Sequence, residues 1–201
     1  PPGSVPEPRT QVVLLVGPSG CGKTYLAHQA GLPILSLDDF YRSDDDPLTP
    51  RDAGGLVDWE SPKAWDRDAA VAALDTLCQR GEVEVPDYSF AKNRATGSKV
   101  ISTRGQALLV AEGIFAAEVI EDLRDRDLLA DALLIRQNRW VTFARRLLRD
   151  AREGRKAPWY LVRQGWEKTK AEPAVVARQQ LLGAQPVTKP EARDRLRVLT
   201  N

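Results

Sequence analysis

Gly17-Pro18-Ser19-Gly20-Cys21-Gly22-Lys23-Thr24 is the stretch that decides the fold class of this chain. It matches the eight-residue phosphate-loop pattern, in which glycines let backbone N–H groups turn towards phosphate oxygens. It follows a continuous apolar run from Gln11 to Val16, which is typical of a strand buried on both faces of a parallel sheet. It precedes a helical pattern from Lys23 to Ala30, whose positive end would face the phosphates. An accidental glycine-rich turn is the alternative, but it would not explain the matching strand and helix on either side.

The phosphate loop predicts ATP as the nucleotide and Mg²⁺ as its metal, with all eight residues of the loop lining the nucleotide site. Lys23 would bring a mobile cation to the β- and γ-phosphates, and the Thr24 hydroxyl would bind Mg²⁺. Cys21 could act as a redox sensor, but a small residue at a variable loop position explains it as well, so we assign it no further role. His28, the only histidine, is also expected to have no catalytic role.

The composition is that of an ordinary globular protein: 201 residues, 42% hydrophobic and 28% charged, with a net charge of +1. No apolar run approaches the roughly 18 residues of a membrane span. Cys21 and Cys78 cannot form a disulfide framework, which favours a reducing, cytoplasmic setting. The proline-rich residues 1–10 are predicted to be a flexible tail, and residues 11–201 a single P-loop domain.

Alternating strand and helix patterns predict an α/β fold with a doubly wound parallel sheet. Between about residues 82 and 103 the period changes to two, which predicts an inserted β-hairpin that turns at Gly97. An Arg-rich lid is predicted at about residues 139–172. The other predicted strands are Pro33 to Leu37, Ala107 to Ala111, Ala132 to Ile135 and an edge strand at Leu196 to Leu199; the other predicted helices are Pro62 to Arg80, Ala116 to Arg124, Arg139 to Glu153 and, with a break near Pro173, Pro158 to Gly183.

Carboxylates follow two of the predicted strands. Asp38 and Asp39 come after the strand that ends at Leu37, and Glu112 follows the strand that ends at Ala111. Parallel strands end at one edge of the sheet, so these acids should lie beside the phosphate loop. One carboxylate there could deprotonate an acceptor hydroxyl and another could hold Mg²⁺. The alternative for Asp38 and Asp39 is that they only cap a loop or a helix.

Four further motifs stand out in the sequence: Leu37-Asp38-Asp39-Phe40-Tyr41; Trp59-Glu60-Ser61-Pro62-Lys63-Ala64-Trp65-Asp66; Glu112-Gly113-Ile114; and Pro86-Asp87-Tyr88-Ser89-Phe90 with Arg94. They resemble the uridine kinase family, the P-loop nucleoside kinases of the phosphoribulokinase-like superfamily, from about Val12 to about Pro173. In the same order, the family patterns are Asp-x-Phe-Tyr, aromatic-Asp-His-Pro-x-x-x-Asp, Glu-Gly-Ile and the pyrimidine-binding hairpin.

The resemblance implies that Asp38 is the catalytic base and that Glu112, with Thr24 and Asp38, holds the metal. It also implies an acceptor site formed by Tyr41, Glu60, Tyr88, Phe90, Asn93, Arg94 and Arg146. The chain departs from the family pattern in two places at this site: Glu60-Ser61 replaces Asp-His, and Asn93 replaces the hairpin histidine. Judged without the resemblance, Tyr88 and Phe90 could simply pack the hairpin.

Cations gather along one predicted helix, where Arg145 and Arg149 lie one turn apart on the same face. The resemblance assigns Arg149 to phosphate and catalysis, Arg155 to the nucleotide and Arg146 to the acceptor. A solvated basic face is the simpler alternative. Nucleic-acid binding is less expected, because the stretch has no interleaved aromatic platform before Trp159.

The sequence therefore predicts a phosphotransferase that moves the γ-phosphate of ATP to a small hydroxylated acceptor, most simply a nucleoside at its 5′-hydroxyl. The enzyme alternative is a P-loop kinase for another metabolite, of the pantothenate or sugar-phosphate type. The other alternative is an ATP-binding regulatory module without turnover. Association into a homo-oligomer stays open, and no membrane partner is expected.

Overall fold

The computed structural model describes residues 10–18, 20–136 and 174–200. Residues 174–181 are helical. The other elements, in chain order, are β1 (Gln11–Val16), α1 (Lys23–Ala30), β2 (Ile34–Ser36), η1 (Leu37–Phe40), η2 (Pro62–Ala64), α2 (Arg67–Arg80), β3 (Glu82–Ser89), β4 (Arg94–Ser102), β5 (Leu108–Gly113), η3 (Ala116–Val119), α3 (Ile120–Asp125), β6 (Leu129–Ile135), β7 (Gln185–Val187) and α6 (Lys189–Thr200), where η denotes a 3₁₀ helix.

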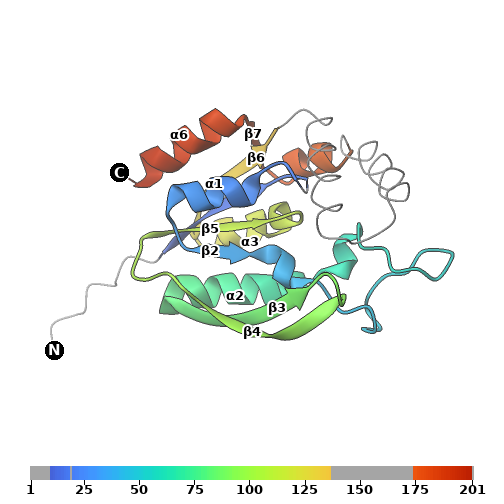
Figure 1. The fold of residues 1–201 in the computed structure, drawn as a ribbon. Coiled ribbons are helices and arrows are strands. Elements are labelled where there is room, and N and C mark those ends of the chain that lie inside the picture. The colour runs from blue at the N-terminus through green and yellow to red at the C-terminus, as the bar shows by residue number, and fades with distance from the viewer. Residues whose placement is uncertain (1–9, 19, 137–173, 201) are drawn as a thin grey trace.

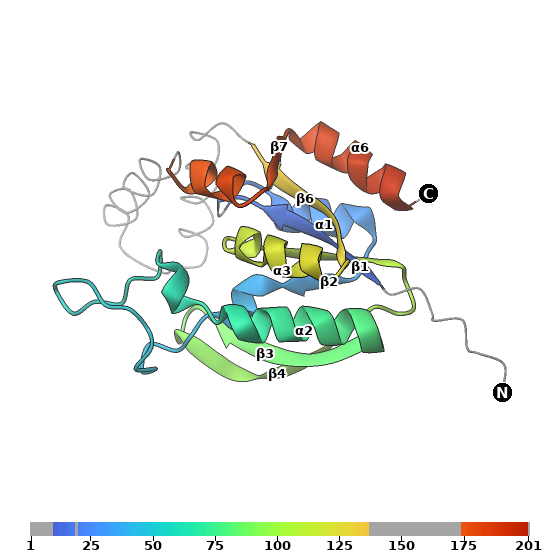
Figure 2. The ribbon, with the colours of Figure 1, turned by 180° about the vertical axis from the view of Figure 1, so that it is seen from behind.

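The centre of the fold is a five-stranded sheet in the order β2-β5-β1-β6-β7, with every neighbouring pair parallel. Helices α1 and α6 cover one face, and helices α2 and α3 cover the other (Figures 1 and 2). Parallel strands need crossover connections, and the helices on both faces supply them. The predicted α/β fold with a doubly wound parallel sheet is confirmed.

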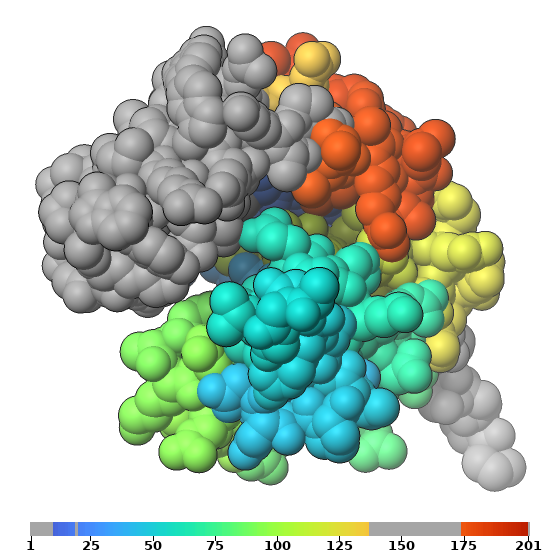
Figure 3. Space-filling model, turned by 90° about the vertical axis from the view of Figure 1, so that its right-hand side faces the viewer, coloured from blue at the N-terminus to red at the C-terminus, as the bar shows by residue number. Residues whose placement is uncertain are grey.

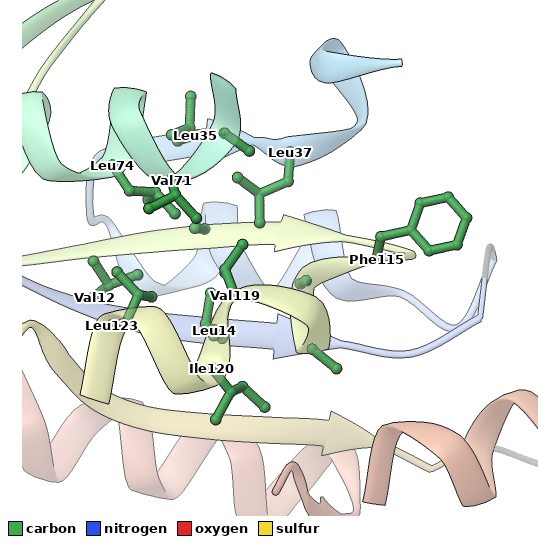
Figure 4. Close-up of a cluster of buried hydrophobic side chains, with 14 of the residues drawn as sticks. Val12, Leu14, Leu35, Leu37, Val71, Leu74, Phe115, Val119, Ile120 and Leu123 are labelled. Atoms are coloured by element: carbon green, nitrogen blue, oxygen red, sulfur yellow. The ribbon is translucent and has the colours of Figure 1, made fainter. Parts of the chain in front are cut away.

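Strand β1 is apolar along its length from Val12 to Val16 because it is buried on both faces of the sheet. Val12, Leu14 and Val16 point into the core beneath α2 and α3, whereas Val13 and Leu15 point into the core beneath α1 and α6. All five side chains are fully buried. Figure 4 shows the first of these cores, where Val12 and Leu14 meet side chains of α2 and α3. This central strand leads directly into the phosphate loop and fixes where that loop begins.

Strands β3 and β4 form a separate antiparallel two-stranded sheet, which confirms the predicted hairpin (Figure 1). The prediction of a turn at Gly97 is wrong. The chain turns at residues 90–93, and Gly97 lies inside β4 opposite Asp87. Asn93 has a φ of 51°, a left-handed conformation that asparagine tolerates better than most residues. The residue that marks the turn in the sequence is therefore Asn93, whereas the prediction had placed the turn at Gly97.

The predicted edge strand at Leu196 to Leu199 is also wrong, because these residues belong to α6. Ala192 and Leu196, four residues apart, form the buried face of this helix. A capping box starts it: Glu191 Oε2 accepts a hydrogen bond from the Thr188 N–H at 2.7 Å, and Thr188 Oγ1 accepts one from the Glu191 N–H at 3.4 Å. The strand at the sheet edge is instead β7, which sequence reasoning missed.

Two further element boundaries differ from prediction. The helix predicted from Pro62 to Arg80 is divided into η2 and α2, because the Asp66 carboxylate accepts a hydrogen bond from the Ala69 N–H at 3.1 Å and caps α2. Thr10, assigned to the tail, is buried and its hydroxyl donates to the Gln106 carbonyl at 2.9 Å.

The predicted lid and the helix predicted from Arg139 to Glu153 lie outside the described residues. Among the residues that are described, no helix combines the length and apolar character needed to cross a membrane.

Candidate active site

The phosphate loop and both acidic motifs meet at one edge of the central sheet. In the strand register, Val16 of β1 lies beside Gly113 of β5, and Ser36 of β2 lies beside Glu112 of β5. Because these strands are parallel, the segments that follow them leave the sheet on the same side. Figure 3 looks onto this side, where the cyan segment that follows η1 projects in front and blue atoms from the start of the chain lie deeper. The predicted convergence of these motifs is therefore observed.

Three glycines of the phosphate loop, Gly17, Gly20 and Gly22, have a positive φ that other residues rarely adopt. Gly22 has a φ of 95° directly before α1 and supplies no side chain to cap the helix. Gly17 has a φ of 143°, and a Cβ there would lie 3.1 Å from the Cys21 sulfur. Cys21 is fully buried and packs in the core beneath α1, which supports a packing role. The N-terminal amides of α1 thus face the loop, as an anion site requires.

Lys23 lies within the curve of the loop. Its side-chain ammonium donates hydrogen bonds to the carbonyls of Gly17 at 2.9 Å and Pro18 at 3.3 Å, and the residue is only 6% exposed. This geometry keeps the cation where phosphate oxygens of a nucleotide would be held. It also shows that Lys23 supports the loop itself, a contribution that the sequence pattern alone did not suggest.

Thr24 and Glu112 form a polar pair across the site: the Thr24 hydroxyl donates to Glu112 Oε1 at 2.9 Å. Glu112 is buried at the end of β5. Among the described residues no group of three His, Cys, Asp or Glu side chains could hold a metal by itself. Mg²⁺ does not need such a group, because it binds through one or two carboxylates together with phosphates, water and other oxygen donors. The hard oxygen donors of Thr24, Glu112 and Asp38 fit Mg²⁺ in this mode.

Asp38 is held in place by the Glu112-Gly113-Ile114 segment. Its Oδ1 accepts a hydrogen bond from the Ile114 N–H at 3.0 Å. The same oxygen lies 2.8 Å from where a Cβ on Gly113 would be, so only glycine leaves it room. The Asp-x-Phe-Tyr and Glu-Gly-Ile motifs are thus parts of one structure.

The surroundings of Asp38 suit a general base. Burial raises its pKa to about 6; Lys23 opposes that shift, Glu112 and Asp39 add to it, and the Ile114 N–H again opposes it. A carboxylate with this pKa is mostly ionised at pH 7 yet more basic than an exposed aspartate. Such tuning is common at catalytic sites.

Gly113→Ala should displace Asp38 and lower kcat by roughly 10²-fold, because small misplacements of reacting groups have effects of that size. ATP affinity should stay within about twofold, since the phosphate loop is untouched. Gly97→Ala is the matched control: its Cβ would meet no heavy atom within 4 Å, and it lies in β4, away from the carboxylate. Steady-state kinetics of the two variants test this prediction. Equal kcat values for Gly113→Ala and Gly97→Ala would contradict the placement of Asp38.

An aromatic cluster surrounds Tyr41, three residues after Asp38. Its ring centroid lies 6.0 Å from Trp59, 5.9 Å from Tyr88, 5.9 Å from Phe90 and 5.7 Å from Phe115. Three of these residues were predicted to line the acceptor site, and Trp59 and Phe115 were missed. The aromatic position before Glu60-Ser61-Pro62 was a signal for Trp59, whereas nothing in the sequence pattern marked Phe115. The cluster brings the hairpin beside the segment that carries Asp38.

The hydroxyl groups of this cluster are already engaged. Tyr41 donates to the Trp59 carbonyl at 3.4 Å, and Tyr88 donates to the Arg42 carbonyl at 3.2 Å. Burial, assisted by the charge of Asp44, raises the pKa of Tyr88 to about 12. Burial, followed by the charges of Asp38 and Glu60, also raises the pKa of Tyr41. The two phenols are therefore neutral, and their polar atoms are bound to the protein itself.

The other predicted acceptor residues are less constrained. Glu60 is exposed, and its charge contributes to the raised pKa of Tyr41. Asn93 is half-buried, and its backbone carbonyl accepts a hydrogen bond from the Asp44 N–H at 3.1 Å. Arg94 is exposed at the start of β4. The remaining predicted site residues, Ser19, Arg146, Arg149 and Arg155, lie outside the described part of the chain.

Helix 174–181 supports the loop that follows Gly113, a connection that sequence reasoning missed. The Gln179 side-chain amide donates to the Ile114 carbonyl at 3.0 Å, and Arg178 pairs with Glu118 at 2.9 Å. Since the Ile114 N–H binds Asp38, this helix buttresses, through the Ile114 carbonyl, the residue whose N–H orients the carboxylate. No periodicity or motif in the sequence marks such a contact.

Comparisons with known proteins show which family this chain is similar to. Residues 12–157 match the model of the Phosphoribulokinase / Uridine kinase family. The chain is 34% identical over 153 residues to a uridine kinase of Schizosaccharomyces pombe, covering 72% of this chain and 33% of that protein. It is 29% identical over 163 residues to a uridine kinase of Deinococcus deserti, covering 78% of this chain and 76% of that protein. The chain thus spans about a third of the fission yeast protein and most of the bacterial one.

A solved structure supports the fold. A protein assigned as a fructose transport system kinase from Silicibacter sp. TM1040 superposes with a TM-score of 0.64 at 18% identity, covering 87% of this chain and 88% of that one. At this identity the likeness concerns the fold alone. The sequence matches confirm the predicted family and, with it, the class of protein, a P-loop small-molecule kinase. The chain belongs to the phosphoribulokinase/uridine kinase family.

Proposed function

We propose that this chain is an ATP- and Mg²⁺-dependent phosphotransferase that moves the γ-phosphate of ATP to a hydroxyl of a small metabolite, with a nucleoside 5′-hydroxyl as the favoured acceptor. The observation that carries the proposal is the position of Asp38. Its carboxylate is fixed by the Ile114 N–H at 3.0 Å, on the same sheet edge as the phosphate loop and next to the aromatic cluster. A base between a nucleotide site and an acceptor surface is the arrangement that phosphoryl transfer needs.

In this mechanism the protein mainly positions and stabilises charge. The loop amides and Lys23 hold the phosphates, and Asp38 orients the acceptor hydroxyl and takes its proton at a carboxylate oxygen. Thr24, Glu112 and Asp38 would hold Mg²⁺, which neutralises phosphate charge when bound. We keep Arg149 and Arg155 as proposed phosphate contacts and Arg146 as a proposed acceptor contact.

The acceptor is the open part of the proposal. The hydroxyls of Tyr41 and Tyr88 are hydrogen-bonded to the protein, so these residues would offer an acceptor mainly their aromatic rings. Hydrogen bonds to the polar groups of the acceptor would then depend on residues such as Glu60, Asn93 and Arg94. Glu60 and Asn93 are among the positions that depart from the uridine kinase pattern. This supports the second candidate, a kinase of the same mechanism with a different acceptor. A cytoplasmic location is proposed with it, supported by the buried free thiols of Cys21 and Cys78.

A coupled ADP-release screen over nucleosides, pantothenate, sugar phosphates and simple alcohols tests the proposal. Turnover that depends on a nucleoside supports the favoured acceptor, and turnover with another alcohol supports the second candidate. ATP binding without turnover on any acceptor would overturn the proposal and leave a regulatory module.

Changing Glu60 and Asn93 to the residues of the family pattern should change which acceptor the protein prefers. We expect the unmodified protein to be a poor uridine kinase and Asn93→His with Glu60→Asp to raise kcat/KM for uridine by roughly tenfold or more, because complementary polar groups can discriminate by about 10⁴. Histidine tolerates the left-handed φ of 51° at position 93, so the turn should survive.

The comparison uses uridine, cytidine and the best acceptor from the screen, with each single variant as a control. KM for ATP should stay constant throughout. If the unmodified protein already prefers uridine and the double variant brings no gain, these departures are neutral and the specificity argument is wrong.

A further inference from the structure

Asp39, the neighbour of the proposed base, has contacts of its own that the mechanism does not use. It is 6% exposed, although a carboxylate is costly to bury without a partner. Its Oδ1 accepts a hydrogen bond from the Tyr88 N–H at 3.4 Å, and its Oδ2 pairs with the Lys99 ammonium at 2.7 Å. Tyr88 belongs to β3 and Lys99 to β4, so one carboxylate contacts both strands of the hairpin.

The hairpin needs such a contact because it does not belong to the central sheet. The described strands form two separate sheets, and β3 and β4 pair only with each other. Figure 1 shows the hairpin lying beside α2, outside the five-stranded sheet. No β-ladder therefore fixes the distance between the hairpin and the catalytic edge. Apart from the hydrogen bond from the Asp44 N–H to the Asn93 carbonyl at the hairpin turn, side-chain contacts such as those of Asp39 set this distance.

The charges favour a persistent contact. Burial alone would lower the pKa of Lys99, but its hydrogen bonds and charge interactions with Asp39 and then Asp87 raise the pKa above its usual value. Lys99 lies 3.3 Å from Asp87, an exposed residue of β3, and 2.7 Å from the buried Asp39. Removing Lys99 would leave a buried carboxylate without its cation, which is far less favourable than losing an exposed pair.

We infer that Asp39 and Lys99 are positioning residues for the acceptor: their ion pair holds the hairpin, with Tyr88 and Phe90, against the 3₁₀ turn that carries Asp38. This inference rests on the proposed function. Asp39 follows Asp38 directly, so a shift of the hairpin relative to Asp39 is also a shift relative to the base. The Tyr88 ring lies 5.9 Å from Tyr41 and 5.0 Å from Phe90, so the same contact aligns the aromatic surface. The pair should govern acceptor binding and leave the nucleotide site unaffected.

Kinetic variants separate this role from a general structural one. Lys99→Met and Asp39→Asn should each raise KM for the acceptor by roughly tenfold or more, with KM for ATP within about twofold of the unmodified protein. Lys99→Arg keeps the charge and should restore most of the acceptor affinity. Lys92→Met is the matched control, because Lys92 is an exposed lysine at the turn of the same hairpin. An unchanged acceptor KM, or an equal rise for ATP, would overturn the inference.

Hydrogen exchange of the full chain gives a readout that needs no turnover. In Lys99→Met and Asp39→Asn the Tyr88 amide should exchange at least about tenfold faster, while amides within α2 keep their rates. Lys92→Met should leave the Tyr88 amide unchanged. Absence of turnover with every acceptor counts against the proposed function, whereas an unchanged Tyr88 amide in both variants counts against the Asp39–Lys99 inference.

Discussion

Lys23→Ala should abolish measurable ATP turnover, with kcat lower by roughly 10²- to 10³-fold, the usual effect of removing one group that stabilises transferring charge. The variant should still fold. Lys23 contributes hydrogen bonds to the Gly17 and Pro18 carbonyls but no apolar packing, so its loss should lower the melting temperature by only several degrees. Acceptor-dependent ADP release and thermal melting, measured together, check both parts.

His28→Ala is the matched control for Lys23→Ala, because His28 is exposed on the same helix and has no assigned role. It should keep full turnover and stability. If Lys23→Ala retains the kcat of the unmodified protein, the assignment of the phosphate loop is wrong.

Asp38→Asn should lower kcat by roughly 10²-fold or more while ATP affinity changes little, because general base catalysis contributes an effect of this order. The asparagine oxygen can still accept the hydrogen bond from the Ile114 N–H, so the local structure should persist. Asp45→Asn is the control, since Asp45 is an exposed aspartate of the segment that follows. A collapse of ATP binding in Asp38→Asn would instead place Asp38 mainly in the metal site.

The same residue predicts a pH dependence. Because the pKa of Asp38 is about 6 and only the ionised carboxylate can accept a proton, kcat/KM of the unmodified protein should fall as the pH falls through about 6. In Asp38→Asn the residual activity should lack this acid limb. A profile of kcat/KM between pH 5 and pH 8 for both proteins would show it.

The fold could be predicted from the sequence where the local residue pattern matches the burial of the segment in the structure. The apolar run of β1 and the glycine pattern after it required a buried parallel strand before a phosphate loop, and that is the arrangement found. Prediction failed at Leu196 to Leu199, where a segment with three apolar residues was interpreted as a strand. Its spacing from Ala192 and the capping box at Thr188 instead favour a helix.

The sequence predicted which acidic residues lie at the site, because their positions after the strands are visible in it. It did not predict the contacts that these residues make with distant parts of the chain. Asp38 and Glu112 could be placed at one sheet edge, because both follow parallel strands. The hydrogen bond from the Ile114 N–H to Asp38, the support from Gln179 and the pairing of Lys99 with Asp39 join residues far apart in sequence. Such contacts depend on how the elements pack, which periodicity and motif spacing do not specify.

Product analysis tests the central claim, Asp38-dependent transfer of phosphate to an acceptor hydroxyl, most directly. The chain is incubated with ATP, Mg²⁺ and the best acceptor from the screen, and the products are quantified by mass spectrometry. Our account predicts one phosphate ester of the acceptor for each ADP released, and loss of both products in Asp38→Asn. ADP formed with free inorganic phosphate and no phosphorylated acceptor, at a rate that Asp38→Asn leaves unchanged, would contradict it.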